Sequence, residues 1–255
     1  MTDLILQTRD LTREFKGFTA VDKVNLNVHR GDIHALIGPN GAGKTTVFNL
    51  LTKYLPPTTG SIYFNGEDIT RVESSAIARK GMVRSFQISA VFPKLSVLDN
   101  VRIALQQQQG NSFHFWKSAQ VLEQLNERAE QLLDSVGLLE FARVTTQDLS
   151  YGRKRALEIA TTLALDPDML LLDEPTQGMG HEDVDRIAEL ILSIRHNRTI
   201  LMVEHNLQVV SRLADRLTVL QRGAILTEGD YASVSADPRV REAYLGVAAD
   251  QEVAA

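Results

Sequence analysis

A glycine-rich stretch, GPNGAGKTT at residues 38–46, contains the residue types that bind a phosphate chain. It fits the pattern G-x-x-x-x-G-K-[ST], in which glycines let successive backbone N–H groups turn toward phosphate oxygens while the following helix adds the positive end of its dipole. Lys44 supplies a positive charge for the β- and γ-phosphates, and the Thr45 hydroxyl is placed to bind Mg²⁺. The stretch predicts a site for ATP and Mg²⁺ formed by Gly38, Asn40, Gly41, Gly43, Lys44, Thr45 and Thr46.

A second candidate for chemistry is the acidic pair Asp173 and Glu174, which directly follows the apolar run MLLL. Open α/β sheets bind their ligands at the carboxyl ends of such strands. Asp173 is expected to hold Mg²⁺ through water, and Glu174 to orient and deprotonate the attacking water. An acidic pair after a strand is also commonly a helix cap or a solvated turn. Together with the phosphate loop, however, the pair favours ATP hydrolysis.

The elements that must position these groups alternate between strands and helices. A short strand, IHALIG, is expected before the loop, and a helix, TTVFNLLTKYL, after it, ending at Pro56 and Pro57. Two nearly continuous apolar runs, MLLLDE and TILMVEH, have the pattern of parallel strands buried on both faces, with the helix DVDRIAELILSIR between them. The predicted fold class is therefore α/β, with a P-loop NTPase core and a mostly parallel sheet.

Two further parts are expected around this core. Residues 4–28 alternate apolar and polar character and predict an N-terminal antiparallel β subdomain, and SIYFNG predicts a strand that turns at Asn65-Gly66. Residues 87–147 predict an inserted α-helical subdomain, because AQVLEQLNERAEQLLDSVGLL has helical periodicity. We therefore expect a single domain over residues 1–250, with its core at 1–86 and 148–250.

Composition narrows the classes of protein that fit. The 255-residue chain has no cysteine, which excludes disulfides, thiolate metal sites and a cysteine nucleophile. Its net charge of −5 gives no basic footprint for nucleic acid, so no nucleic-acid partner is expected. The N-terminus lacks the pattern of a secretory signal, and no apolar stretch approaches the ~18–20 residues of a spanning helix. We expect a cytoplasmic protein that reaches a membrane only through a protein partner.

Five elements occur in one order: the phosphate loop, Gln87, LSYGRKRALEIA at 149–160, MLLLDEP, and VEH at 203–205. Together they resemble the nucleotide-binding subunit of an ATP-binding-cassette (ABC) transporter over essentially the whole chain. The resemblance implies a RecA-like core in which Gln87 touches Mg²⁺ and signals to the membrane subunit, and His205 bridges the γ-phosphate and the attacking water. It also implies that Phe15 stacks on adenine, with Phe18 as the competing candidate.

The segment LSYGR at 149–153 corresponds to the LSGGQ signature loop of this family. By resemblance, Ser150 and Gly152 contact the γ-phosphate that is bound on the opposite subunit of a head-to-tail dimer. Considered alone, the segment is a helix start with Ser150 as its cap. Tyr151 replaces a glycine of the family pattern, and Arg153 replaces the usual glutamine.

A further departure follows Glu174, where Gly180 stands in place of the family's aspartate that contacts the opposite subunit. His181 and Asp183 lie close by in the sequence. The resemblance therefore carries over no aspartate for this contact between subunits.

Several segments narrow the choice within the family: GMVRSFQ, FHFWKSAQ, LSYG and PRVREAYLG. They resemble the ATPase subunits of branched-chain amino-acid importers, with amide and urea importers and the lipopolysaccharide exporter as alternatives. The resemblance implies a second ABC ATPase subunit, identical or different, two membrane permeases, an external solute-binding protein, and a peripheral location on the cytoplasmic face of the inner membrane. The permeases are expected at a groove around Gln87, with Phe92 and Trp116 in the subdomain core.

Two other classes of protein fit the sequence less well. A cassette ATPase that acts on ribosomes or in DNA repair normally has tandem cassettes or a long coiled-coil insertion, and this chain has neither. A non-hydrolysing regulatory module is disfavoured by the presence of Lys44, Asp173, Glu174 and His205. The sequence of this subunit does not identify the transported molecule, because selectivity resides in the permease and the solute-binding protein.

Overall fold

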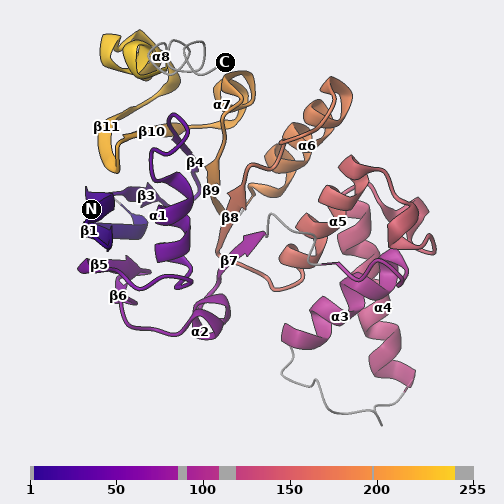
Figure 1. The fold of residues 1–255 in the computed structure, drawn as a ribbon. Helices are drawn as coiled ribbons and strands as arrows, with labels where there is room; N and C mark the ends of the chain where they lie inside the picture. The colour runs from indigo at the N-terminus through magenta and orange to yellow at the C-terminus, as the bar shows by residue number, and fades with distance from the viewer. Residues whose placement is uncertain (1–2, 86–90, 109–118, 197, 245–255) are drawn as a thin grey trace.

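The computed structural model describes residues 3–85, 91–108, 119–196 and 198–244, which form two β-sheets and a set of helices (Figure 1). The strands are β1 (Leu4–Phe15), β2 (Phe18–Val24), β3 (Asn27–His29), β4 (Ile33–Ile37), β5 (Thr59–Phe64), β6 (Glu67–Asp68), β7 (Met82–Ser85), β8 (Met169–Asp173), β9 (Thr199–Val203), β10 (Arg216–Gln221) and β11 (Ala224–Gly229). The α-helices are α1 (Lys44–Leu51), α2 (Ser74–Arg79), α3 (Val97–Gln108), α4 (Ala119–Ser135), α5 (Tyr151–Leu163), α6 (His181–Ile194), α7 (Leu207–Leu213) and α8 (Tyr231–Ala236). Short 3₁₀ turns occur at Leu139–Phe141 and Thr146–Asp148.

The larger sheet has the strand order β11-β10-β4-β9-β8-β7, and every pairing in it is parallel except that of β11 with β10. All residues of β4, β8 and β9 are buried. Their alternate side chains enter two different cores, one under the helices and one under the antiparallel sheet. The predicted parallel strands with two buried faces are thereby confirmed.

The antiparallel sheet has the order β2-β1-β5-β6, with β3 paired to β1. At the turn between β5 and β6, Asn65 and Gly66 both have positive φ, 50° and 78°. These angles allow the tight hairpin predicted from the Asn-Gly dipeptide. Figure 1 shows this sheet together with α1 on one side of the parallel strands, and α3, α4 and α5 on the other. The predicted combination of antiparallel, parallel and helical parts is confirmed.

Two local predictions were wrong. Helix α1 ends at Leu51 rather than near Pro56, because Lys53 adopts a left-handed φ of 62° and the Thr52 hydroxyl bonds the Phe48 carbonyl. Phe92 is 52% exposed and not part of the subdomain core, and Trp116 lies outside the described residues. Among the helices described, none has both the length and the apolar character needed to cross a membrane.

His34, in the middle of β4, is a buried titratable group outside the site. Its Nε2 lies 2.8 Å from the Thr218 hydroxyl, which donates to the Glu228 carboxylate at 3.1 Å, so Nε2 carries the proton. Burial, then the charge of Arg216 and that of His29, lower the pKa of His34 from 6.5 to about 3. The native protein therefore keeps this imidazole neutral in mildly acidic solution.

We expect the native protein to lose stability through His34 as the pH falls from about 6.5 toward 3. In that window the unfolded chain binds a proton that the native chain does not, so the free energy of unfolding falls by up to ~1.4 kcal/mol per pH unit. His34→Gln, which keeps a donor for Thr218, should give a shallower slope when urea unfolding is measured at successive pH values. Equal slopes for both proteins would contradict the assignment.

Candidate functional site

The phosphate loop connects β4 to α1, and backbone atoms of β2 and β10 pack tightly against it. A side chain at Gly38 (φ 148°) would lie 2.2 Å from the Leu220 carbonyl oxygen, and one at Gly43 (φ 102°) would lie 2.5 Å from the Ala20 carbonyl oxygen. Only glycine fits at these two positions, since both the conformation and the space exclude a Cβ. The close packing fixes the loop against β2 and β10.

Helix α1 begins at Lys44, within the last residues of this stretch. Gly43 is its N-cap, no side chain caps it, and its first turn contains no acidic residue. Its first N–H groups are thus left for an anion, which the helix dipole also favours. Thr45, whose hydroxyl is the predicted metal ligand, is exposed at this end of the helix, and Thr46 is partly exposed.

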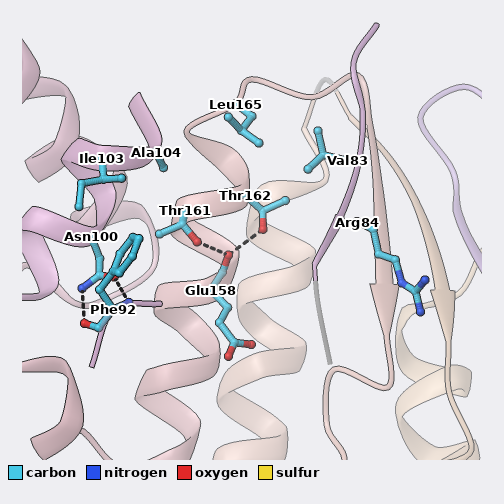
Figure 2. A pocket seen from close by; sticks show the side chains of 10 residues that line it. All are labelled: Val83, Arg84, Phe92, Asn100, Ile103, Ala104, Glu158, Thr161, Thr162 and Leu165. Carbon is cyan, nitrogen blue, oxygen red and sulfur yellow. Dashed lines mark hydrogen bonds between the residues drawn. The ribbon is translucent and has the colours of Figure 1, made fainter. Parts of the chain in front are cut away.

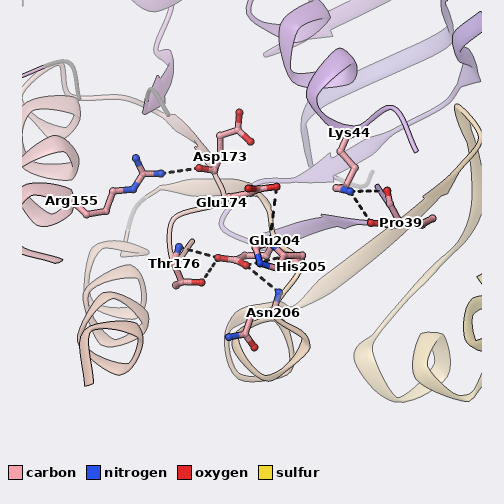
Figure 3. Close-up of polar contacts among 10 residues, drawn as sticks. Pro39, Lys44, Arg155, Asp173, Glu174, Thr176, Glu204, His205 and Asn206 are labelled. Carbon is pink, nitrogen blue, oxygen red and sulfur yellow. Dashed lines mark hydrogen bonds and ion pairs between the residues drawn. The ribbon is translucent and has the colours of Figure 1, made fainter. Parts of the chain in front are cut away.

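The Lys44 ammonium group lies folded back over the loop. Its Nζ donates to the Gly38 carbonyl at 2.7 Å and to the Pro39 carbonyl at 3.0 Å (Figure 3). Burial lowers its pKa below the ordinary lysine value, and the charges of Glu174 and Asp173 partly offset this effect. The ammonium therefore lies within the electrostatic reach of both acidic residues, at the place where phosphate oxygens are expected.

Asp173 is the last residue of β8 and is held by two arginines. Its carboxylate Oδ2 pairs with Arg84 of β7, and its backbone carbonyl accepts a hydrogen bond from Arg155 of α5 at 2.7 Å. Arg155 in turn pairs with Glu158 one helical turn on, at 2.7 Å. The other carboxylate oxygen, Oδ1, is buried and accepts no hydrogen bond from the described residues.

Glu174 and His205 follow neighbouring strands, β8 and β9, and face one another. The Glu174 Oε1 lies 4.0 Å from the His205 Nδ1, and the histidine side chain is 53% exposed. Glu174 has a positive φ of 45°, a conformation of order 1–3 kcal/mol above the favoured regions for such a residue. Its N–H donates to the Val203 carbonyl at 2.9 Å, which holds the strained residue to β9.

Glu204, a fully buried carboxylate, connects the two loops that carry Glu174 and His205. Its Oε1 accepts from the N–H (3.1 Å) and hydroxyl (2.6 Å) of Thr176, and its Oε2 accepts from the N–H groups of His205 (3.1 Å) and Asn206 (3.2 Å) (Figure 3). The sequence alone predicts no role for Glu204. The available signal was an acidic residue ending an otherwise apolar strand.

Ser150 and Gly152 lie at the start of α5, away from the phosphate loop of the same chain (Figure 1). The Ser150 hydroxyl accepts from the Arg153 N–H at 3.4 Å, which confirms the predicted helix cap. Gly152 lies against α6, because a Cβ on it would be 2.6 Å from the Asp183 carboxylate. The Arg153 guanidinium stacks on Phe141, 4.0 Å from the ring centre.

Gly180 is the N-cap of α6, with Asp183 in the first turn of that helix and His181 as its first residue. The replacement of the family's aspartate by Gly180 therefore lies at the start of α6. This end of the helix packs against the segment LSYGR at 149–153. No aspartate occupies the place of Gly180 itself.

Phe15 and Phe18 are paired across the hairpin that joins β1 to β2. Their exposed fractions are 38% and 66%, and the Arg13 guanidinium covers one face of Phe15 at 4.6 Å from the ring centre. Exposure therefore leaves both available to an adenine ring. Gln87 lies outside the described residues.

A groove of about 250 Å³ opens between β7, α3 and α5 (Figure 2). Phe92 lies at its wall and is fixed by Asn100, which accepts from the Phe92 N–H at 2.6 Å and donates to its carbonyl at 3.1 Å. Glu158 also lines the groove, and Thr161 and Thr162 donate to its carbonyl. Through Glu158 and Arg155, this groove is connected to Asp173 by direct contacts.

The comparisons with known proteins agree with this geometry. A family model described as "ABC transporter" matches residues 21–177, and one described as "Branched-chain amino acid ATP-binding cassette transporter" matches residues 224–250. The branched-chain amino acid transport ATP-binding protein BraF of Pseudomonas aeruginosa is 38% identical, with 97% of this chain and all of the relative covered. The corresponding LivG of Escherichia coli is 37% identical with the same coverage.

Solved structures give the same result for the fold. The ADP conformation of MJ1267, an ATP-binding cassette of an ABC transporter, superposes with a TM-score of 0.84 at 30% identity, over 96% of this chain and all of that one. A nucleotide-free ATP-binding cassette from an ABC transporter superposes with a TM-score of 0.83 at 30% identity, over 94% and 98% of the two chains.

Proposed function

This chain belongs to the ABC transporter family of ATP-binding proteins, and from that membership we propose that it hydrolyses ATP to energise the import of branched-chain amino acids. The observation that carries the proposal is the convergence of Lys44, Asp173, Glu174 and His205 at the carboxyl ends of neighbouring parallel strands (Figure 3). This edge is where open α/β sheets bind ligands.

The chain's own residues supply each part of the hydrolytic step. Backbone N–H groups within residues 40–46 and the Lys44 ammonium bind the β- and γ-phosphates at the edge of the sheet that carries Glu174. Glu174 accepts a proton from the attacking water as the water oxygen bonds the γ-phosphorus and the bond to the departing ADP breaks, and His205 orients that water and the γ-phosphate oxygens. Phe15, or its neighbour Phe18, stacks on the adenine.

The residues present fit a magnesium ion. Asp173 offers a buried oxygen without a hydrogen bond from any described residue, and Thr45 offers an exposed hydroxyl at the start of α1. Oxygen ligands of this kind, with nucleotide phosphates completing the shell, are those that Mg²⁺ takes in nucleotide sites. When bound, the ion neutralises charge on the β- and γ-phosphate oxygens. Gln87 is proposed as a further ligand.

The partners follow from the parts of the site that one chain leaves incomplete. Ser150 and Gly152 lie away from the phosphate loop of their own chain, so we propose that they complete the ATP site of a second, head-to-tail ATPase subunit, identical or related. The groove beside Phe92 and Glu158 would receive a permease segment (Figure 2). Two permeases and a solute-binding protein complete the proposed importer, with this subunit bound peripherally at the cytoplasmic face of the inner membrane.

Transport itself is the test of this proposal. In cells that lack the gene, uptake of radiolabelled leucine, isoleucine and valine should fall and be restored by the wild-type chain, but not by Glu174→Gln. Unchanged uptake of these amino acids, together with lost amide or urea uptake or lost lipopolysaccharide export, would identify one of the related transporters instead. Restoration by Glu174→Gln would favour a non-hydrolysing regulatory role.

A further inference from the structure

Arg84 lies between the carboxylate expected to hold the metal ion and the helix that follows the phosphate loop. Its Nη2 pairs with Oδ2 of Asp173 on β8, and its Nη1 donates to the Asn49 side-chain oxygen on α1 at 2.7 Å. The guanidinium also lies over the Phe48 ring of α1, 5.6 Å from its centre. One side chain of β7 thus ties the end of β8 to the helix that carries Lys44 and Thr45.

Two properties of arginine matter here: its charge compensates Asp173, which the magnesium increment measures, and its shape holds Asp173 and Asn49 at once. A guanidinium is a planar fork with donors on separate nitrogens, so it can hold two acceptors in fixed directions at once. A lysine keeps the charge but offers one compact ammonium on a flexible stem. Figure 2 shows the Arg84 side chain pointing away from the α5 residues Glu158, Thr161 and Thr162. Its guanidinium lies instead against α1, where it contacts Asn49 and Phe48.

The pair is buried. The side chain of Asp173 is 1% exposed and that of Arg84 10% exposed. Removing the cation from a buried ion pair strongly destabilises the folded protein, because neither water nor another charge replaces the lost interaction with the carboxylate. Lys44 is near, but its ammonium is directed to the carbonyls of Gly38 and Pro39. In the part of the chain that the structure describes, Arg84 is thus the cation bonded to this carboxylate.

The two carboxylate oxygens of Asp173 have different surroundings. Oδ2 is bonded to Arg84, whereas Oδ1 accepts no hydrogen bond from the described residues. We propose that Arg84 is a positioning residue for the magnesium site: it neutralises Asp173 when no ion is bound and fixes the carboxylate so that Oδ1 remains for the ion or its water. This inference rests on the proposed function, because it takes Asp173 as a metal-binding residue.

A measurable consequence follows from the shared carboxylate. Arg84 and a bound Mg²⁺ compensate the same negative charge, so each stabilises the protein less when the other is present. If Arg84 is removed, the ion supplies a larger share of the compensation. The stabilisation gained from Mg²⁺ should therefore rise in Arg84→Gln, although the ion-free variant is itself less stable.

The experiment compares melting temperatures with a β,γ-imido analogue of ATP, once with EDTA and once with Mg²⁺. The difference between the two is the magnesium increment. We expect Arg84→Gln without nucleotide to melt on the order of 10 °C below the wild type, and its magnesium increment to exceed that of the wild type by at least about 4 °C. Arg84→Lys, which keeps the charge, should have an increment close to that of the wild type.

Two further variants test whether the effect of Arg84→Gln on the magnesium increment comes from its contact with Asp173 and not from a general loss of stability. Arg84→Gln/Asp173→Asn removes the uncompensated charge and should melt above Arg84→Gln without nucleotide, a non-additive result that shows direct coupling. Arg102→Gln is the matched control, because Arg102 pairs with Asp99 on α3 in a more exposed pair, and it should leave the magnesium increment unchanged.

The outcomes separate this inference from the proposed function. If the wild type shows no magnesium increment, the proposed site for ATP with Mg²⁺ is wrong. If the wild type shows an increment and Arg84→Gln shows an equal or smaller one, Arg84 is a structural arginine and this inference is overturned. An increment raised equally in Arg84→Lys and Arg84→Gln would also overturn it, because the charge would then be irrelevant.

Discussion

Replacing Glu174 by glutamine should lower the turnover number for ATP by about 10²–10⁴-fold while ATP binding is retained. The amide has the size of the carboxylate but accepts no proton from water. Removing the negative charge also removes repulsion with the γ-phosphate, so the dissociation constant for ATP should stay the same or fall. Steady-state phosphate release and equilibrium titration with a fluorescent ATP analogue measure the two quantities separately.

The same substitution should convert ATP from a substrate into a stable ligand. If Ser150 and Gly152 complete the site of a second copy, Glu174→Gln with ATP should form a dimer that light scattering detects, and should remain monomeric without nucleotide. A variant that binds ATP and stays monomeric would show that a different ATPase subunit supplies the second half-site.

A suitable control is Glu127→Gln, which removes an exposed carboxylate on α4 and should leave turnover within about twofold of the wild type. If Glu174→Gln itself hydrolysed ATP at a rate close to the wild type, Glu174 would not be the general base. The position of His205, whose Nδ1 lies 4.0 Å from the Glu174 carboxylate, would then make the histidine the next residue to test.

The parts of the fold that could be predicted from the sequence are those in which a local pattern decides the outcome. MLLL is apolar at every position and TILMV at every position after Thr199, and the structure makes them strands with both faces buried. Asn65-Gly66 predicts a tight turn because its two residues tolerate positive φ, and both adopt it. The phosphate loop belongs to the same class, because its glycines encode backbone geometry directly.

The parts that were missed depend on partners far away in the sequence. Arg84 lies in the short strand MVRS, and nothing local reveals that its partners are Asn49, 35 residues before it, and Asp173, 89 residues after it. The premature end of α1 has a similar origin. Lys53 takes a left-handed φ and its ammonium reaches the Thr70 carbonyl at 3.2 Å, a contact made only in the folded chain.

Glu204 illustrates the same limit within the site. The sequence VEH drew attention to His205, and the acid before it had no visible purpose. In the fold, strand β9 runs beside β8, so the Glu204 carboxylate reaches across to Thr176 in the loop that follows Glu174. The role of Glu204 is thus a property of the strand order and not of the segment that contains it.

Glu204→Gln should destabilise the protein by about 3 kcal/mol and lower its melting temperature by roughly 6–12 °C. The carboxylate accepts four hydrogen bonds while fully buried. Glutamine can keep the two from Thr176 through its oxygen, but its NH₂ group then faces the N–H groups of His205 and Asn206. Two partly buried donors are left without acceptors, and the loop that carries His205 is released from the loop that carries Glu174.

The functional consequence separates loop positioning from phosphate binding. Among the described residues, the phosphate loop and Lys44 make no hydrogen bond to Glu204. The dissociation constant for ATP should therefore change less than about threefold. Turnover should fall at least tenfold, because the geometry between Glu174 and His205 is lost. Glu189→Gln, at an exposed pair with Arg212, should shift stability by less than about 0.5 kcal/mol. If Glu204→Gln weakened ATP binding and turnover by the same factor, the carboxylate would support the whole nucleotide site instead of the alignment of the two catalytic loops.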